Sequence, residues 1–400
     1  MSLRADAAAM QNDLAEIRRD LHGFPEIGLH LPRTQDTVLA ALDGLPLEIT
    51  RGTALSSVTA VLRGGAPGPV VLLRGDMDAL PVLERTGLAF ASRNHGVMHA
   101  CGHDLHTAGL IGAARLLSAR QADLAGDVVF MFQPGEEGLD GAAHMIEEGV
   151  LAAAGRLADA AYGLHVTAAD LPSGMFASRP GPLMAAADQF TVRVVGAGGH
   201  GSRPHRAKDP IPAACEMVLA LQSMVTRGFD VFDPVVVTVG AFHAGTACNV
   251  IPDDVVFDTT IRSFSPAARE RVLERAERTC AGIAAAHGID LETNCDAGYP
   301  VTANHDEDAR LVAETVRDVF GEERFVELPR PMAGSEDFSR VLDRVPGAFL
   351  FLGAAVGDPE QASANHSPRA VFDDAVLADA AALLAELAVR RLAIGASPAA

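Results

Sequence analysis

Two apolar runs that end abruptly in acidic side chains constrain the fold of this chain more than any other feature. Residues 69–81 read PVVLLRGDMDALP, and residues 127–138 read DVVFMFQPGEEG. A continuous apolar run of this length is typical of a strand buried on both faces, as in a parallel sheet covered by helices. A helical pattern over 104–119 separates the two runs. This alternation predicts an α/β fold, in which ligands bind beyond the carboxyl ends of the strands.

The pattern changes near Pro180, where strands with one solvated face begin. Alternation of apolar and polar residues starts at Asp188, and the elements that follow read helix 211–224, strand 235–239, strand 254–263, helix 266–287 and strand 289–294. This β-α-β-β-α-β order is that of a ferredoxin-like α+β unit. The α/β pattern returns after Pro300. A chain of 400 residues exceeds one compact core, so we predict an α/β domain over 1–182 and 298–400 that is interrupted by a smaller domain over 183–297.

Charge and composition exclude several classes of partner. With 32 basic and 52 acidic residues the net charge is −20, which repels nucleic acid. Five cysteines are an odd number, which argues against a disulfide framework and for a reducing compartment. The first twenty residues predict an amphipathic helix rather than a signal peptide, and no stretch fits a membrane span. We therefore expect a cytoplasmic protein with no nucleic-acid or membrane partner and a disordered tail from Gly395.

A short segment rich in sulfur and imidazole groups is the first candidate for chemistry. Residues 99–106 read HACGHDLH and bring Cys101, His103 and His106 close together in sequence. Thiolate and imidazole are preferred ligands of zinc and other transition metals. Taken alone, this segment fits a buried structural thiol and a capped histidine equally well.

Adjacent carboxylates give the second candidate. Glu136 and Glu137 follow the second apolar run in a glycine-rich turn, where unpaired carboxylates are costly. Neighbouring side chains on an extended segment point in different directions. One carboxylate can therefore ligate a metal while the other reaches a water molecule that the metal activates.

Two further histidines complete a donor set. His165 ends a short apolar run in 161–166, and His366 follows the apolar strand at 348–355. Each alone also fits a histidine of the core or of a loop. Together with Cys101, His103 and Glu137 they supply five donors, more than the four of a structural zinc site. Such a set suits two metals that share a bridging group.

Motifs along nearly the whole chain resemble those of one family. They are Arg19-DLHGFPEIG, Leu73-RGDMDALP, Met98-HACGHDLHTA, Phe132-QPGEEG, Gly163-LH, Gly198-GHGSRPH, Cys248-NVIPD, Gly334-SEDF and Asn365-HSP. In this order they are similar to the aminoacylase/carboxypeptidase family of dinuclear metallohydrolases, in the branch of hippurate hydrolase and the auxin-conjugate amidohydrolases. The resemblance implies a zinc-peptidase-like α/β catalytic domain over 1–182 and 298–400. It also implies that the ferredoxin-like insertion over 183–297 is a lid that forms a homodimer.

The resemblance also implies roles for particular residues. Two divalent metals (zinc, manganese, cobalt or nickel) would be held by Cys101, His103, Glu137, His165 and His366, with Cys101 as the bridge. Glu136 matches the general base, and Asp78 matches an acid that orients the ligands. Asp76 stands where other branches place a metal-binding histidine, which puts a ligand role for it in doubt.

The implied reaction is hydrolysis of the amide bond of N-acyl amino acids, such as hippurate-like or acetylated substrates. In the lid, His200 matches a histidine that reaches the substrate carbonyl from the partner subunit, and Asn249 and Arg262 match residues that contact the amide and the substrate carboxylate. An alternative is a dipeptidase or carboxypeptidase that uses the same dinuclear site. A second alternative is a catalytically silent ligand-binding homologue, which the presence of every motif residue disfavours.

Overall fold

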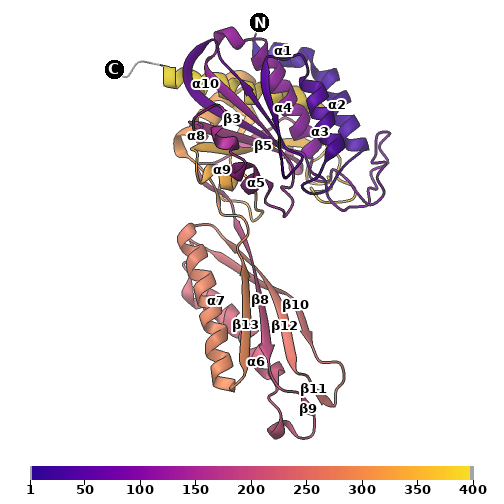
Figure 1. Ribbon diagram of the computed structural model, residues 1–400, viewed down its shortest axis with the longest axis vertical. Helices are drawn as coiled ribbons and strands as arrows, with labels where there is room; N and C mark the ends of the chain where they lie inside the picture. The colour runs from indigo at the N-terminus through magenta and orange to yellow at the C-terminus, as the bar shows by residue number, and fades with distance from the viewer. Residues whose placement is uncertain (1, 397–400) are drawn as a thin grey trace. The chain divides into compact units, whose positions relative to one another are not determined.

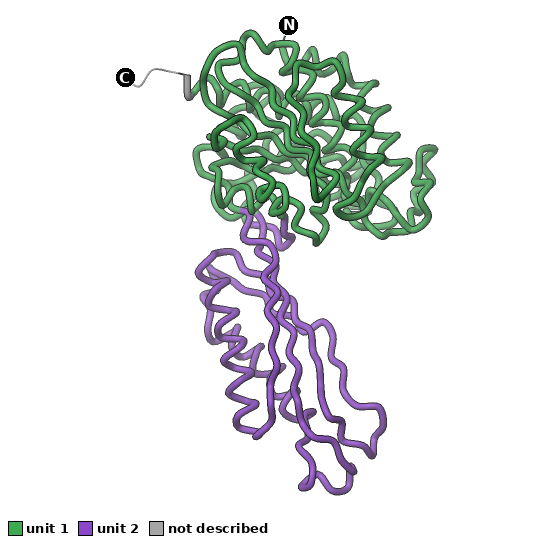
Figure 2. The backbone as a smooth tube through the Cα atoms, in the orientation of Figure 1, with its two compact units in different colours: residues 1–183, 303–330, 337–400 green, residues 184–302, 331–336 purple. Residues whose placement is uncertain are grey.

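The computed structural model describes residues 2–396, which fall into two compact units (Figure 2). Unit 1 comprises the residues up to Leu183 together with Ala303–Arg330 and the chain from Asp337 onward. Unit 2 comprises Met184–Thr302 and Pro331–Glu336. The tail was expected to be disordered from Gly395, but residues 395 and 396 belong to the last helix, which ends at Ala396, and residues 397–400 lie outside the described residues. The lid and dimerisation role that the resemblance implies for 183–297 stays a prediction.

Unit 1 is built on an eight-stranded mixed sheet with strand order β1-β2-β4-β3-β5-β16-β6-β15 (Figure 1). The bounds of its strands are β1 (Leu47–Arg51), β2 (Val58–Leu62), β3 (Ala66–Asp76), β4 (Ala125–Gln133), β5 (Ala160–Pro172), β6 (Phe176–Ser178), β15 (Phe325–Glu327) and β16 (Gly347–Ala355). The neighbours β4, β3, β5 and β16 all run parallel. Because parallel strands share one carboxyl edge, the segments that follow these four strands meet at that edge.

Helices cover the central strands of this sheet. Helix α4 (His103–Ser118) and helix α10 (Leu377–Ala396) pack against each other and against β3, β4 and β5. Helices α1 (Leu3–Ala9), α2 (Gln11–Gly23) and α3 (Pro32–Leu42) form a further layer that contacts α4 (Figure 1). The remaining helical segments of unit 1 are α5 (Gly141–Glu147), α8 (Asp306–Phe320), α9 (Ser339–Leu342), and the 3-10 turns η1 (Gln121–Asp123), η2 (Val150–Ala152), η4 (Glu322–Arg324) and η5 (Asp374–Val376).

Burial along β3 explains why its sequence is apolar throughout. From Val70 to Asp76 every residue of the strand is buried, as expected for a strand with helices over its faces. Fourteen of the sixteen residues of α4 are buried too, because α10 and the outer helices surround it. The α/β fold class predicted from the two apolar runs is confirmed.

Unit 2 contains a four-stranded antiparallel sheet with strand order β10-β12-β8-β13. Its elements are β8 (Ala186–Val195), β9 (Gly199–His200), η3 (Pro204–Arg206), α6 (Pro210–Gly228), β10 (Val235–Ala244), β11 (Val250–Ile251), β12 (Asp254–Ser263), α7 (Pro266–His287) and β13 (Asp290–Asp296). The short strands β9 and β11 pair with each other, and β7 (Gly181–Met184) pairs with β14 (Thr302–Asn304). Chain order and strand order together give the predicted ferredoxin-like topology.

The sequence fixes the bounds of α7 through local signals. Ser265 accepts a hydrogen bond from the backbone N–H of Ala268, and Pro266 occupies the first turn, where its missing N–H costs nothing.

Burial on β12 alternates with period two, which places Val255, Phe257 and Ile261 in the core of unit 2. Among the described residues, no helix combines the length and apolar character needed to cross a bilayer.

Candidate metal centre

The five predicted metal ligands come from four segments that meet at the carboxyl edge of the unit 1 sheet. Cys101 and His103 stand at the start of α4, and Glu137 lies in the turn after β4. His165 belongs to β5, and His366 lies in the loop after β16. All five residues are in unit 1, so one compact unit brings them together.

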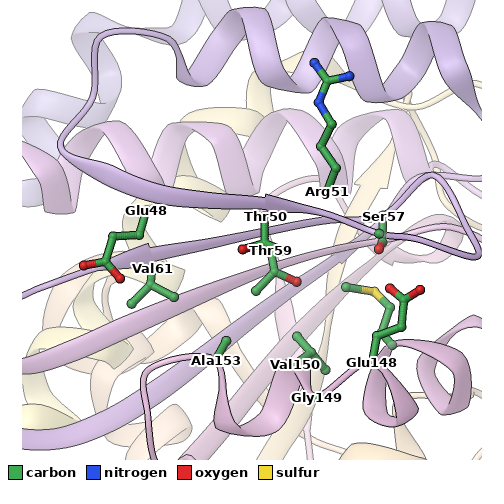
Figure 3. Close-up of a pocket in the computed structure, with 12 residues that line it drawn as sticks. Glu48, Thr50, Arg51, Ser57, Thr59, Val61, Glu148, Gly149, Val150 and Ala153 are labelled. Atoms are coloured by element: carbon green, nitrogen blue, oxygen red, sulfur yellow. The ribbon is translucent and has the colours of Figure 1, made fainter.

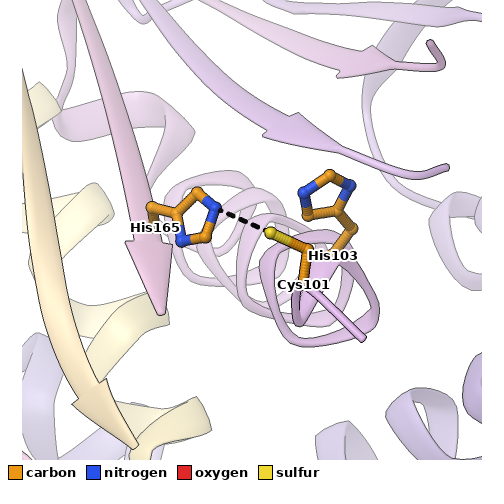
Figure 4. A group of neighbouring side chains, drawn as sticks. All are labelled: Cys101, His103 and His165. Carbon is orange, nitrogen blue, oxygen red and sulfur yellow. Dashed lines mark hydrogen bonds between the residues drawn. The ribbon is translucent and has the colours of Figure 1, made fainter. Parts of the chain in front are cut away.

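Distances between the side chains show a tight cluster around one sulfur atom. The Sγ atom of Cys101 lies 3.3 Å from Nε2 of His165 and 3.2 Å from Nε2 of His366. Figure 4 shows Cys101 between the rings of His103 and His165. Nε2 of His366 is in turn 3.2 Å from Oε1 of Glu137.

Two groups of possible ligands share the thiol. In one group, ligand atoms of Cys101, His103 and His165 lie within 4.8 Å of one another, and in the other the same holds for Cys101, Glu137 and His366. The fully buried Nε2 atom of His103 makes no hydrogen bond to any described residue. Its nearest carboxylate oxygens, Oδ2 of Asp76 and Oε1 of Glu137, lie 3.6 Å and 3.9 Å away. A buried imidazole nitrogen with no hydrogen bond is costly unless it binds something. The donor set of sulfur, nitrogen and carboxylate oxygen therefore fits transition-metal ions of the zinc type.

Asp78 lies between His103 and the backbone of the paired glutamates, Glu136 and Glu137. Its Oδ1 lies 3.4 Å from Nδ1 of His103 and accepts a hydrogen bond of 3.0 Å from the backbone N–H of Glu136. Its Oδ2 accepts a bond of the same length from the N–H of Glu137. One buried carboxylate thus holds the turn that carries the two glutamates and lies next to the His103 ring. A carboxylate of Glu136 lies within 4.8 Å of ligand atoms of His103 and Glu137.

Burial and charge shift the pKa values of these groups in opposite directions. Burial raises the pKa of the Cys101 thiol to about 12, so the thiol is protonated in the metal-free protein at neutral pH. Burial also lowers the pKa of His165 well below its usual value, which keeps that imidazole neutral. For Glu137, burial acts to raise the pKa, but the bond with His366 and the charge of His103 outweigh it and lower the pKa. A neutral imidazole and an ionised carboxylate are the forms that ligate metals.

Gly102 is required between Cys101 and His103. Its φ is +88°, in the left-handed region that side chains with a Cβ rarely adopt. A Cβ at this position would also lie 2.4 Å from Cγ2 of Val166 and 3.0 Å from Cε1 of Phe372. Glycine therefore permits both the turn into α4 and the close approach of this turn to Val166 in the middle of β5.

Asn365 holds three of the ligand-bearing segments together, a role that the sequence did not reveal. Its Nδ2 donates to the carbonyl oxygens of Cys101 (3.2 Å) and Val166 (3.0 Å), and its Oδ1 accepts from the N–H of Ala168 (2.8 Å). The next residue, His366, has a φ of +69°, which costs free energy for a residue with a Cβ. Only its position beside the ligand His366 could have pointed to Asn365.

A buried ionic network lies behind the ligands. The Arg74 guanidinium pairs with Asp76 at 2.6 Å and with Asp337 at 2.9 Å, and Gln133 donates to both oxygens of Asp337. Burial acts to raise the pKa of Asp76, but the charges of Arg74 and His103 outweigh it and hold that pKa well below its usual range. Asp337 belongs to the Gly334-SEDF motif, to which the sequence analysis gave no role.

The remaining predicted site residues lie in unit 2. His200 is on β9 opposite Val250 of β11, and its Nδ1 accepts a hydrogen bond from the N–H of Ser202 at 3.1 Å. The carbonyl oxygen of Asn249 accepts from the N–H of Gly201, which places Asn249 beside His200. Arg262 is on β12, and it forms no ion pair with any of the residues 2–396.

A pocket of about 190 Å³ in unit 1 contains none of the predicted site residues. Figure 3 shows that strands β1 and β2 form one wall and the segment 148–153 the other. Glu148 at its edge accepts hydrogen bonds from the backbone N–H groups of Thr53 and Ala54. These bonds already give its carboxylate a structural role.

Comparison with known proteins agrees with this geometry. Residues 72–390 match the model of peptidase family M20/M25/M40. Thermostable carboxypeptidase 1 of Saccharolobus solfataricus is 37% identical over 97% of this chain and 98% of its own length. Hippurate hydrolase of Campylobacter jejuni is 36% identical over 98% of this chain and 100% of its own length. The crystal structure of a dinuclear metal-binding peptidase of the M20 family from Bacillus subtilis superposes with a TM-score of 0.83 at 34% identity, covering 96% of this chain and 99% of that chain.

The α/β unit brings a thiol, imidazoles and carboxylates together near the carboxyl edge of its parallel strands. Together with the relatives, this arrangement defines the protein as a metal-dependent hydrolase of amide bonds. More specifically, the chain belongs to peptidase family M20/M25/M40. The family predicted from the motifs is therefore confirmed, and so is the prediction of an enzyme.

Proposed function

We propose that this enzyme hydrolyses N-acyl amino acids to a carboxylate and a free amino acid, using two divalent metals. The observation that carries the proposal is the pair of three-residue groups that share Cys101. A thiol that belongs to both groups could act as the ligand shared by two ions. Cys101, His103, Glu137, His165 and His366 would hold the two ions, whose identity among zinc, manganese, cobalt and nickel we leave to experiment.

The chemistry then follows from the side chains around the cluster. When bound, the two ions would acidify a water molecule and polarise the carbonyl oxygen of the substrate amide. Glu136 accepts the proton of the attacking water and then delivers it to the nitrogen of the leaving amine. Asp78 keeps Glu136 in place by accepting its backbone N–H. Water adds to the carbonyl carbon, the C–N bond breaks, and no covalent enzyme intermediate is needed.

Substrate recognition is assigned to unit 2. Arg262 would bind the carboxylate of the amino acid, since a guanidinium binds carboxylates through two parallel hydrogen bonds. Asn249 would contact the amide of the substrate. His200 would reach the carbonyl oxygen in the active site of the partner subunit of a homodimer formed through the lid.

Free cysteines, three of them exposed, support a reducing cytoplasmic location.

A substrate panel tests the proposed reaction. Purified enzyme is stripped of metal, reloaded with Zn²⁺, Mn²⁺, Co²⁺ or Ni²⁺ in turn, and assayed on N-benzoyl and N-acetyl amino acids and on dipeptides with a free amino terminus. We expect hydrolysis of the N-acyl compounds and little hydrolysis of the dipeptides. Activity that is insensitive to metal removal would overturn the metal mechanism.

The same panel decides the second candidate function. The similarity to thermostable carboxypeptidase 1 favours an enzyme that removes a carboxy-terminal residue from a peptide. Preferential hydrolysis of dipeptides with a free amino group would establish that alternative and overturn the N-acyl assignment.

Mixing two inactive variants tests the action of His200 across a dimer. His200→Ala leaves Glu136 intact, and Glu136→Gln leaves His200 intact. In a mixed dimer, one active site would combine Glu136 of its own chain with His200 of the partner. We expect activity to return once subunits exchange. Confirmed exchange with no return of activity would refute the assignment.

A further inference from the structure

His106, one turn into α4, makes two hydrogen bonds that the proposed mechanism does not use. Its Nδ1 is bonded to Oδ1 of Asp76, and its Nε2 accepts the backbone N–H of Val166 at 2.7 Å. The His106 ring is buried and lies beside that of His165, with 4.6 Å between the ring centroids. His106 therefore bridges the end of β3 to the middle of β5.

These two bonds fix the tautomer of His106. A backbone N–H can only donate, so Nε2 of His106 carries no proton. The ring proton is therefore on Nδ1, where the carboxylate of Asp76 accepts it. Both ring nitrogens are occupied, which leaves neither of them for a metal ion although Asp76, His103 and His106 form a compact group.

Close packing of α4 on β3 places His106 beside Asp76. A Cβ on Gly75 would lie 2.9 Å from the carbonyl oxygen of His106, so only glycine allows the helix to approach the strand so closely. Next to it, Thr107 Oγ1 donates to the carbonyl oxygen of Asp76 at 2.8 Å. The first turn of α4 is thereby held to the end of β3.

The backbone of Val166 connects His106 to a proposed metal ligand: its N–H bonds to His106 and its carbonyl oxygen, in the next peptide group, bonds to His165. The carbonyl oxygen of Val166 accepts a hydrogen bond of 2.7 Å from Nδ1 of His165. That bond places the proton of His165 on Nδ1 and leaves its Nε2 lone pair facing Cys101. Hydrogen bonds of this kind fix the orientation and tautomer of metal-ligating histidines.

We propose that His106 is a positioning residue that holds the backbone of Val166 by its N–H and, through the adjoining carbonyl group, keeps His165 in the orientation needed to bind metal. Asp76 acts with it by fixing the proton on Nδ1. This inference rests on the proposed function, because it assumes that His165 is a metal ligand. It explains why an acid occupies position 76: the acid orients an imidazole and is not itself available to the metal.

Two substitutions of His106 separate this role from a purely structural one. His106→Asn keeps a donor for Asp76 but lacks an acceptor that can reach Val166. His106→Gln is longer, and its amide oxygen can take the place of Nε2. His99→Asn is the matched control, because His99 is a buried histidine of the same segment whose ring nitrogens bond to no described residue.

Co²⁺ affinity is measured by competition with a chelator, the visible spectrum of bound Co²⁺ is recorded, and kcat and KM are determined on an N-acyl amino acid that the wild type hydrolyses. We expect His106→Asn to lose about 10- to 100-fold in Co²⁺ affinity, with an altered spectrum and a lower kcat at similar KM. His106→Gln should recover most of the affinity, and His99→Asn should keep the wild-type spectrum. Hydrogen exchange at the Val166 amide in the middle of β5 should rise in His106→Asn alone.

The outcomes distinguish this inference from the proposed function. Wild-type affinity and spectrum in His106→Asn would overturn the positioning role while leaving the proposed function intact. Equal losses in His106→Asn and His106→Gln would also overturn it, because they would show that the acceptor for Val166 is irrelevant. A wild-type protein that binds none of Zn²⁺, Mn²⁺, Co²⁺ and Ni²⁺ would overturn the proposed function and this inference with it.

Discussion

Replacement of Gly102 by alanine tests whether the metal centre depends on the packing of α4 against β5. Two separate penalties act on this variant. The φ of +88° places an alanine in the left-handed region, which costs roughly 1–2 kcal/mol. The new Cβ would stand 2.4 Å from Cγ2 of Val166, and overpacking of a tight core costs about 1–3 kcal/mol.

One effect works in the opposite direction. Alanine reduces the entropy of the unfolded chain, which stabilises the folded protein by about 0.4–1 kcal/mol. The net loss in the free energy of unfolding should be about 2–4 kcal/mol. Val166 is the nearest neighbour that has to shift, and its backbone N–H and carbonyl oxygen bond to His106 and His165, so metal affinity should fall as well.

Gly96→Ala is the control for backbone strain alone. Gly96 has a similar φ of +80°, but no atom lies within 4 Å of its added Cβ. This variant should lose only about 1 kcal/mol and should bind metal normally. Denaturant unfolding of the metal-free proteins, followed by circular dichroism, measures the free energies, and chelator competition measures the affinities. Equal destabilisation of the two variants would refute the packing argument.

Three further predictions concern single side chains. Glu136→Gln should keep both metals by elemental analysis and lose about 10²- to 10⁴-fold in kcat, and loss of metal from this variant would contradict the division of roles with Glu137. Cys101→Ser should lower metal occupancy. In the wild type, burial raises the pKa of the Cys101 thiol to about 12. Burial acts to lower the pKa of His103, but the charge of Asp76 outweighs it and raises that pKa, so metal uptake releases at least one proton. Affinity should therefore rise at least about tenfold from pH 7 to pH 8, and a flat profile would argue against thiolate ligation. Burial lowers the pKa of His99 to about 3, so below pH 6.5 the unfolded chain binds a proton that the folded chain excludes. The free energy of unfolding of the metal-free protein should therefore fall by up to about 1.4 kcal/mol per pH unit between pH 6.5 and pH 3. His99→Asn should lose less over the same range.

Local sequence signals indicated several of the central elements and the residues that could bind metal. The run at 69–81 predicted a doubly buried strand, because covering helices remove any need for polar residues along it. Ser265 and Pro266 marked the start of α7, and the helix begins there. The types of the five donors are visible in the sequence because the chemistry of metal binding restricts ligands to a few side chains.

Contacts between segments that are distant in the chain could not be predicted from local sequence patterns. Asn365 joins the segments of Cys101 and His165 by three hydrogen bonds, and nothing in its own sequence surroundings specifies those partners. The pairing of Arg74 with Asp337 spans 263 positions of the chain. Such bonds depend on which strands become neighbours, and that is decided by packing of the whole sheet.

The case of His106 shows the physical reason for this division. The sequence by itself determined that an imidazole lies near the donor cluster, because His106 is three residues from His103 in a helical segment. Only the tertiary structure decided that this imidazole supports the cluster and does not itself ligate. That distinction depends on which atoms face Nδ1 and Nε2, and those atoms belong to Asp76 and Val166 on two different strands. Residue type is a local property, whereas the state of a buried titratable group is set by its neighbours in space.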